Sequence, residues 1–113
     1  MPEVVEVCLT ALWLHYELKD KELTDVKVLA GRYSRHPLPG LNNFKKNNKY
    51  KIIKISSKGK FMWFELKDKN DNMLYILNRF GLSGEWGFTE QDHNNVKFIV
   101  DNKTNLYFTD PRN

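Results

Sequence analysis

The chain has 113 residues, of which 41% are hydrophobic and 13% aromatic, and its formal net charge at pH 7 is +4. This length predicts a single domain with its own hydrophobic core, and no apolar run approaches the roughly 20 residues that span a bilayer. Cys8 is the only cysteine, which excludes an internal disulfide and a cysteine-based zinc site, and no basic region precedes an apolar run as in a secretory signal. We therefore expect an intracellular protein that does not bind membranes and uses no metal or other cofactor. Its positive net charge suits a polyanionic partner.

Apolar residues at helical spacing predict a long helix over Val4–Leu18, with two apolar stripes that call for neighbours on two sides. The next element, Leu23–Ala30, alternates like a strand, and Leu41–Asn48 is compatible with a short helix. The remainder predicts six strands, at Lys49–Ser56, Lys60–Leu66, Met73–Arg79, Gly84–Phe88, Val96–Asp101 and Leu106–Thr109. This order predicts an α+β fold, an antiparallel β-sandwich with a long N-terminal helix and a short second helix.

Polar residues divide these elements. Asp68–Asn72 and Asp101–Asn105 have the composition of hairpin turns, and residues 92–95 are interpreted as a polar turn. Three scattered histidines do not predict a metal site, and His15 is interpreted as a core or boundary residue. Cys8, on the helix, is expected to be a small core residue.

The N-terminal residues hold a candidate covalent catalyst. Once Met1 is removed, Pro2 presents a secondary amine, which adds to a sugar aldehyde and gives an iminium. Glu3 is placed to act as a general acid, and the positive end of the following helix would lower the pKa of the amine. A purely structural interpretation stays open, because proline and glutamate also suit the first turn of a helix.

Three further stretches join the N-terminus, namely Ser57-Lys58-Gly59-Lys60-Phe61, Arg79-Phe80-Gly81-Leu82-Ser83-Gly84 and Phe108-Thr109-Asp110-Pro111-Arg112-Asn113. In order and spacing the four stretches resemble the N-terminal domain of the formamidopyrimidine-DNA glycosylase and endonuclease VIII family of base-excision repair enzymes. The resemblance covers residues 1–113 as one catalytic-type domain. Residues 31–34 and 58–66 are most similar to its endonuclease VIII-like branch, which includes plant and giant-virus members.

The resemblance implies a DNA glycosylase and abasic-site lyase that acts on oxidised bases flipped out of double-stranded DNA. In that role Pro2 attacks the deoxyribose C1′ and Glu3 protonates the ring oxygen. Glu6 matches a second carboxylate that holds the site and the sugar, and Lys60 matches a lysine that serves damage processing and phosphate contact. This chemistry requires no metal.

The same resemblance implies a DNA-binding set. Leu82 would enter the gap left by the flipped base, and Arg112 would face the base on the opposite strand that is left unpaired. Arg32, Arg35 and Lys58 are predicted to contact phosphates, although basic residues of this kind also serve simply as a solvated face.

Two departures from the family leave a second interpretation open. Family members continue beyond Asp110–Asn113 into a helix-two-turn-helix domain and a finger, which are absent from these 113 residues, and a retained Met1 would turn the Pro2 amine into an unreactive amide. The alternative is a truncated, non-catalytic DNA-binding or structural module of virion type, which could assemble with other protein chains. For a giant-virus protein, we expect a nuclear, viral-factory or virion location.

Overall fold

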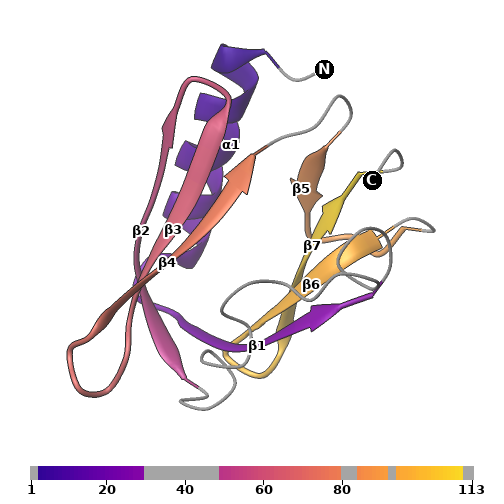
Figure 1. The fold of residues 1–113 in the computed structure, drawn as a ribbon. Coiled ribbons are helices and arrows are strands. Elements are labelled where there is room, and N and C mark those ends of the chain that lie inside the picture. The colour runs from indigo at the N-terminus through magenta and orange to yellow at the C-terminus, as the bar shows by residue number, and fades with distance from the viewer. Residues whose placement is uncertain (1–2, 30–48, 80–83, 92–93, 111–113) are drawn as a thin grey trace.

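The computed structural model describes residues 3–29, 49–79, 84–91 and 94–110, and Figure 1 shows one helix beside an antiparallel sheet. Helix α1 spans Val4–Leu18. The strands are β1 (Glu22–Val28), β2 (Tyr50–Lys58), β3 (Phe61–Lys67), β4 (Met73–Arg79), β5 (Glu85–Gly87), β6 (Asn94–Val100) and β7 (Thr104–Thr109). These elements confirm the predicted α+β class, and the expected short helix at Leu41–Asn48 lies outside the described residues.

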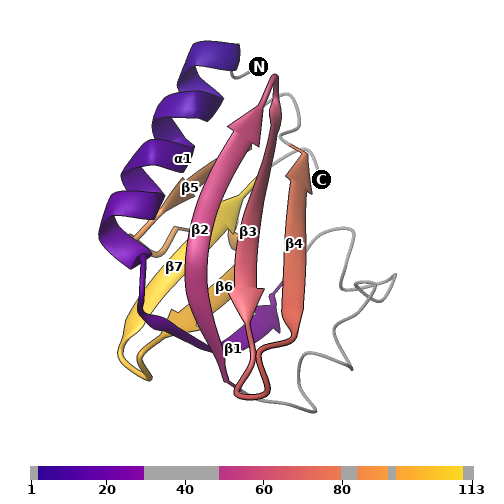
Figure 2. The same cartoon turned by 90° about the vertical axis from the view of Figure 1, so that its left-hand side faces the viewer.

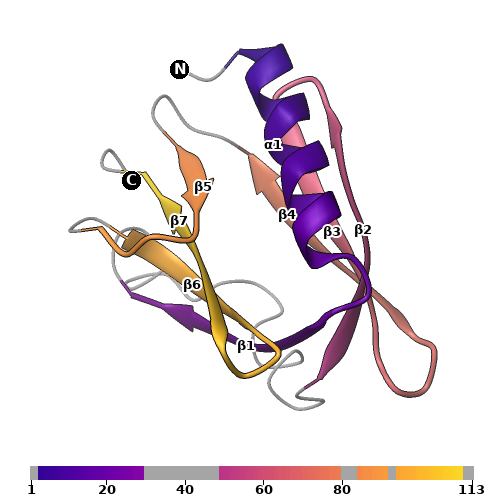
Figure 3. The ribbon, with the colours of Figure 1, turned by 180° about the vertical axis from the view of Figure 1, so that it is seen from behind.

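The seven described strands form one sheet in the order β4-β3-β2-β1-β6-β7-β5, with every pairing antiparallel. Strand β1 pairs with β2 only through Glu22 and Leu23, whereas it pairs with β6 along most of its length. The sheet turns at this junction, so that β4-β3-β2 faces β1-β6-β7-β5 (Figures 1 and 3). The two packed sheets that we predicted are thus two layers of one continuous sheet.

Aromatic rings fill the space between the two layers. The fully buried Phe64 of β3 lies with its ring centroid 5.3 Å from that of Trp86 and 5.2 Å from that of Phe98, on β5 and β6. Trp86 in turn lies 5.1 Å from Phe108 of β7. Tilted and edge-to-face ring pairs of this kind stabilise a core beyond the area that they bury. The cluster therefore joins the layers across the sandwich.

Helix α1 covers the part of β2 that is not paired with β1 (Figure 2). It buries Val7, Ala11, Leu14 and Leu18 on one face. The backbone N–H of Ile55 donates a hydrogen bond of 3.1 Å to Nδ1 of His15, which agrees with a boundary role for that histidine. Ile52 also exchanges two hydrogen bonds of 2.8 Å with the backbone of Asp20 and Lys21. These hydrogen bonds occupy backbone groups on the edge of β2 that would otherwise be available to pair with another chain.

Within the described chain only one apolar stripe of this helix is covered, and Val5, Leu9, Leu12 and Tyr16 are exposed, so the second neighbour stays a prediction. The prediction for Cys8 is wrong, because this residue, expected in the core, is exposed. Among the residues that the structure describes, no helix has both the length and the apolar character needed to cross a bilayer.

Candidate active site

The described parts of the predicted site gather toward one end of the sandwich. The N-terminal end of α1, the β2–β3 turn and the C-terminal ends of β4 and β7 all point to this end (Figures 1 and 3). We call it the rim, defined by Glu3, Glu6, residues 58–60, the end of β4 at Arg79, and Asp110. The predicted residues Pro2, Arg32, Arg35, Leu82 and Arg112 lie outside the described part of the chain.

The first described residues place two carboxylates at the start of α1. Glu3 is the N-cap residue, with φ −80° and ψ 163°, and its carbonyl oxygen accepts the N–H of Val7 at 3.0 Å. The Glu3 carboxylate makes no capping hydrogen bond to the helix, and both Glu3 and Glu6 are exposed. A helix N-terminus carries a partial positive charge. The two carboxylates are therefore presented outward beside the positive end of the helix, immediately after Pro2.

The β2–β3 turn carries the two lysines of the predicted site. Lys58 pairs with Phe61, which leaves Gly59 and Lys60 as a two-residue hairpin turn. Gly59 has φ +60°, and a Cβ added there would meet nothing within 4 Å, so the position requires glycine for its backbone angle and not for space. Lys58 is exposed and Lys60 half-buried. The turn thus brings two cationic side chains to the rim.

A side-chain hydrogen bond joins β4 and β5, the strands that flank residues 80–83 in sequence. The indole Nε1–H of Trp86, on β5, donates to Oδ1 of Asn78, on β4, at 3.0 Å. The bond ties together the strands on either side of residues 80–83. Sequence reasoning assigned Trp86 to the core, which is correct for its ring, but overlooked Asn78. The signal was available, because a buried indole N–H usually needs an acceptor.

Two buried asparagines hold the end of β7, next to Arg112. Asn94 donates from Nδ2 to Oγ1 of Thr109 at 2.7 Å and accepts the N–H of Gln91 at 2.8 Å. Asn95 accepts the backbone N–H of Asp110 through its Oδ1. The predicted polar turn at these asparagines is wrong, since both belong to β6 and are buried. A buried polar network with satisfied partners fixes a unique backbone path, here the path of β7 as far as Asp110.

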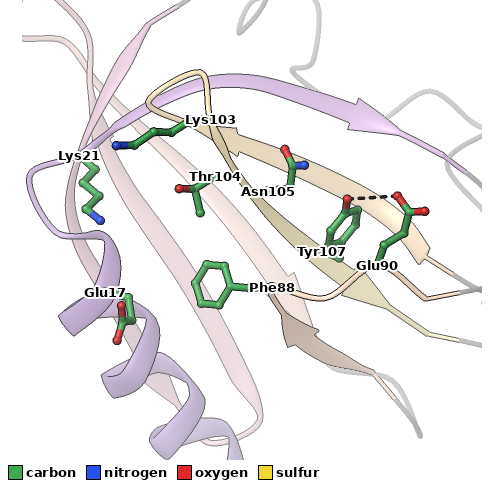
Figure 4. A pocket seen from close by; sticks show the side chains of 8 residues that line it. All are labelled: Glu17, Lys21, Phe88, Glu90, Lys103, Thr104, Asn105 and Tyr107. Atoms are coloured by element: carbon green, nitrogen blue, oxygen red, sulfur yellow. Dashed lines mark hydrogen bonds between the residues drawn. The ribbon is translucent and has the colours of Figure 1, made fainter.

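A shallow pocket of about 530 Å³ lies away from the rim, between the C-terminal half of α1 and the β6–β7 hairpin (Figure 4). Its described lining consists of Glu17, Lys21, Phe88, Glu90, Lys103, Thr104, Asn105 and Tyr107, none of which is a predicted site residue. Because the pocket is wide open and mixes both charges, it does not resemble an enclosed ligand site.

The pocket wall includes a hydrogen-bonded pair of titratable groups. The Tyr107 hydroxyl donates to Oε2 of Glu90 at 3.3 Å. Burial raises the pKa of Tyr107 above its ordinary value of 10.0, and the neighbouring Glu90 carboxylate raises it further. Within the described ranges, no three His, Cys, Asp or Glu side chains are grouped so as to hold a metal ion.

Comparisons with known proteins agree with this architecture. The family model for the formamidopyrimidine-DNA glycosylase N-terminal domain matches residues 1–113. A formamidopyrimidine-DNA glycosylase of Wolbachia sp. subsp. Drosophila simulans (strain wRi) is 28% identical, over 99% of this chain and 41% of the relative. The chain thus spans about two fifths of the length of that protein.

Solved structures share the fold. The MutM (Fpg) protein of Thermus thermophilus superposes with a TM-score of 0.75 and 21% identity, over 98% of this chain and 37% of that one. The Lactococcus lactis formamidopyrimidine-DNA glycosylase, bound non-covalently to DNA with an AP site, gives a TM-score of 0.78 and 20% identity, over 98% and 41% of the two chains. A MutM complex with DNA containing carbocyclic 8-oxo-G gives the same four values. From the family match along its whole length, the chain belongs to the formamidopyrimidine-DNA glycosylase N-terminal domain family.

Proposed function

We propose that the rim is the site of a base-excision repair glycosylase and abasic-site lyase that acts on double-stranded DNA with an oxidised or missing base. One observation carries the proposal. Four parts of the chain that are far apart in sequence, namely residues 3–6, residues 58–60, the end of β4 at residue 79, and residue 110, reach the same end of the sandwich (Figure 1). The DNA complexes of the MutM and Lactococcus lactis relatives support the choice of substrate.

In the glycosylase step, the neutral amine of Pro2 forms a bond to the deoxyribose C1′ as the bond from C1′ to the base breaks. The base leaves with its electron pair and takes up a proton. The Glu3 carboxyl protonates the ring oxygen, so that the sugar opens and the C1′–nitrogen bond becomes an iminium. The position of Glu3 at the helix start supports this role, because its side chain is exposed and makes no cap to the helix.

In the lyase step, the iminium acts as the electron sink. Loss of a proton from C2′ breaks the bond from C3′ to its phosphate oxygen, and the DNA strand is cut. Water then hydrolyses the conjugated iminium, releases the sugar fragment and restores the Pro2 amine. Lys60, on the Gly59 turn, would contact the departing phosphate, and Glu6 would hold the sugar.

Binding of a flipped nucleotide requires groups that replace its contacts in the duplex. Leu82 would fill the gap in the base stack, and Arg112 would face the unpaired base of the opposite strand. The Trp86–Asn78 bond and the contact of Asn95 with Asp110 hold the described residues that flank these two positions in sequence. Lys58, Arg32 and Arg35 would contact phosphates.

Two finer assignments belong to the same proposal. Residues 31–34 and 58–66 favour the endonuclease VIII-like branch of the family, and a DNA substrate favours an intracellular or virion location. A second candidate function, DNA binding without catalysis, is favoured by the exposed lysines Lys54 and Lys58 on β2, the second of which lies at the rim. Such cations bind phosphates whether or not Pro2 has a free amine.

Borohydride trapping separates the two candidates. The chain is incubated with a duplex that has one abasic site, borohydride reduces any iminium to a stable amine, and mass spectrometry reports both the adduct and the N-terminus. A processed Pro2 should give an adduct at the N-terminal peptide. Glu3→Gln should reduce base release from a duplex with an oxidised base, whereas Glu17→Gln, an equally exposed change at the other end of α1, should not. Processed protein that binds the duplex without trapping would favour the non-catalytic module.

A further inference from the structure

The outer face of β2, β3 and β4 combines aromatic rings with lysines. Figure 2 looks onto this face, where the three strands lie side by side and no described element crosses in front of them. Along β3, buried residues alternate with half-buried ones, and the pairing registers continue the half-buried set onto β2 and β4. We call six residues of this face the platform, namely Lys54, Lys58, Phe61, Trp63, Lys67 and Tyr75.

Two rings of the platform are neighbours. The indole Nε1–H of Trp63 donates to Oε2 of Glu65, two positions later on the same strand, at 3.0 Å, and this bond orients the indole along β3. Tyr75 lies directly opposite Glu65 on β4, so it is a diagonal neighbour of Trp63, at about 7–8 Å. Tyr75 is 54% exposed, whereas Trp63 is half-buried. The platform thus presents one open ring beside one ring that a hydrogen bond holds.

Positive charge surrounds these rings. The three strands contain four lysines and one arginine but a single carboxylate, Glu65. One of the lysines, Lys51, lies 3.7 Å from Asp20. Lys54 lies opposite Glu65 on β2, Lys58 lies four positions further along, at about 13 Å, and both are exposed. Cations therefore outnumber anions around the rings, and a polyanion is the complementary partner.

We propose that the platform binds an unpaired stretch of nucleic acid, with bases stacked on Tyr75 and Trp63 and backbone phosphates beside Lys54 and Lys58. Proteins that hold single strands combine cations that follow the backbone with rings on which successive bases stack. A sheet face that carries such rings is one of the surfaces on which unpaired bases bind. Bases inside a duplex are stacked on each other, so they offer no free face to Tyr75. The platform therefore takes a different ligand from the damaged duplex proposed for the rim, and the inference goes beyond that function.

A protein partner fits the platform less well. Lysine is depleted from the cores of protein interfaces, and association carries the cost of desolvating polar groups that end up imperfectly paired. Here Lys54 lies across Glu65 from the exposed Tyr75, so a protein that covered the ring would also cover the ammonium group. A nucleic acid strand instead brings a phosphate to each lysine while its bases cover the rings.

Fluorescence anisotropy with labelled oligothymidylate and oligouridylate tests the proposal on the full chain. Wild type should bind both, because both have phosphates and stackable bases, and the tighter of the two identifies DNA or RNA as the source. Tyr75→Ala should weaken both roughly 5- to 150-fold, the loss expected from one stacked base, without changing the circular dichroism spectrum. Tyr75→Phe keeps the ring and should bind like wild type. Tyr16→Ala is the matched control, since Tyr16 is 84% exposed on α1, outside the platform, and it should leave both affinities unchanged.

Two further measurements separate the charges from the rings. For a single strand, Lys54→Ala should lower the magnitude of the slope of log affinity against log salt concentration by about 0.7 for one phosphate contact. Inorganic polyphosphate, which has the charge without the bases, should bind wild type and Tyr75→Ala equally. No binding of either oligomer at low salt, or equal affinities of wild type and Tyr75→Ala for the oligomers, would overturn the proposal. Borohydride trapping on the abasic-site duplex should be unchanged by Tyr75→Ala, so failure of oligomer binding and failure of the rim chemistry are separate results.

Discussion

Asn95→Ala gives a sharp test of how the fold positions the rim. The substitution removes the Oδ1 that accepts the backbone N–H of Asp110 and leaves that buried donor without this partner. An unsatisfied buried donor costs about 1–3 kcal/mol. At about 2.1 cal/mol/K per residue over 113 residues, a loss of about 2 kcal/mol lowers the melting temperature by about 8 °C. The backbone bond from Leu29 N–H to the Asn95 carbonyl is kept, so strand β1 should stay in place.

Two measurements are needed, because stability and positioning are separate effects. Thermal melts followed by circular dichroism should show the lowered melting temperature, and Asn70→Ala, in an exposed turn, should melt within 2 °C or so of wild type. Affinity for an abasic-site duplex, measured well below both melting temperatures, should also fall, because Asp110 at the rim is no longer held by Asn95. Equal melting of the two variants would refute the hydrogen-bond reasoning, and unchanged affinity would refute the positioning role.

Three further outcomes are expected. The folded-state pKa of Tyr107 is raised above 10.0, so the protonated hydroxyl stabilises the fold below pH 10, and this stabilisation is lost as the pH rises through the folded-state pKa. In urea melts, the free energy of unfolding of Tyr107→Phe should therefore fall less above pH 10 than that of wild type. If Lys58 contacts one phosphate, Lys58→Ala should reduce by about 0.9 the magnitude of the slope in a plot of log affinity for duplex DNA against log salt concentration. The control Lys69→Ala, in the β3–β4 turn, should leave this slope unchanged. At Gly59, with φ +60°, alanine should cost about 1–2 kcal/mol, and asparagine less than alanine, in chemical denaturation; equal costs would contradict a purely backbone requirement.

The sequence predicted the order and type of the described elements because their signals are local. Alternation of apolar residues placed β3 and β4 within a residue or two, and the polar stretch Asp68–Asn72 does form the turn between them. There the backbone N–H groups of Asn72 and Asn70 donate to Asp68 and lower the pKa of its carboxyl. Such turns are encoded by residues that are neighbours in the chain.

The errors arose where long-range packing decides the outcome. The exposed apolar stripe of α1, formed by Val5, Leu9, Leu12 and Tyr16, has the same helical spacing as the buried one, and periodicity cannot tell which stripe meets the sheet. Asn94 and Asn95 have turn-like composition, but partners 15 residues away draw them into β6. For the site itself, the resemblance named Glu3, Glu6, Lys58 and Lys60, and their roles stay predictions. The buried indole of Trp86 indicated that some acceptor was needed, but only the placement of β4 beside β5 shows that this acceptor is Asn78.

The pairing of β1 with β6 has a consequence for how the protein folds. Leu23 lies opposite Val100, 77 positions later in the chain, and this ladder attaches β6, β7 and β5 to β1, the strand through which they connect to β2. Contacts between such distant residues must close a long loop before they gain any stability, which slows folding. The rim draws on segments from residue 3 to residue 110, so it is completed only when this late ladder has formed. Partly folded chains would thus lack an assembled rim, and the proposed activity on DNA should emerge only in the last, cooperative step of folding.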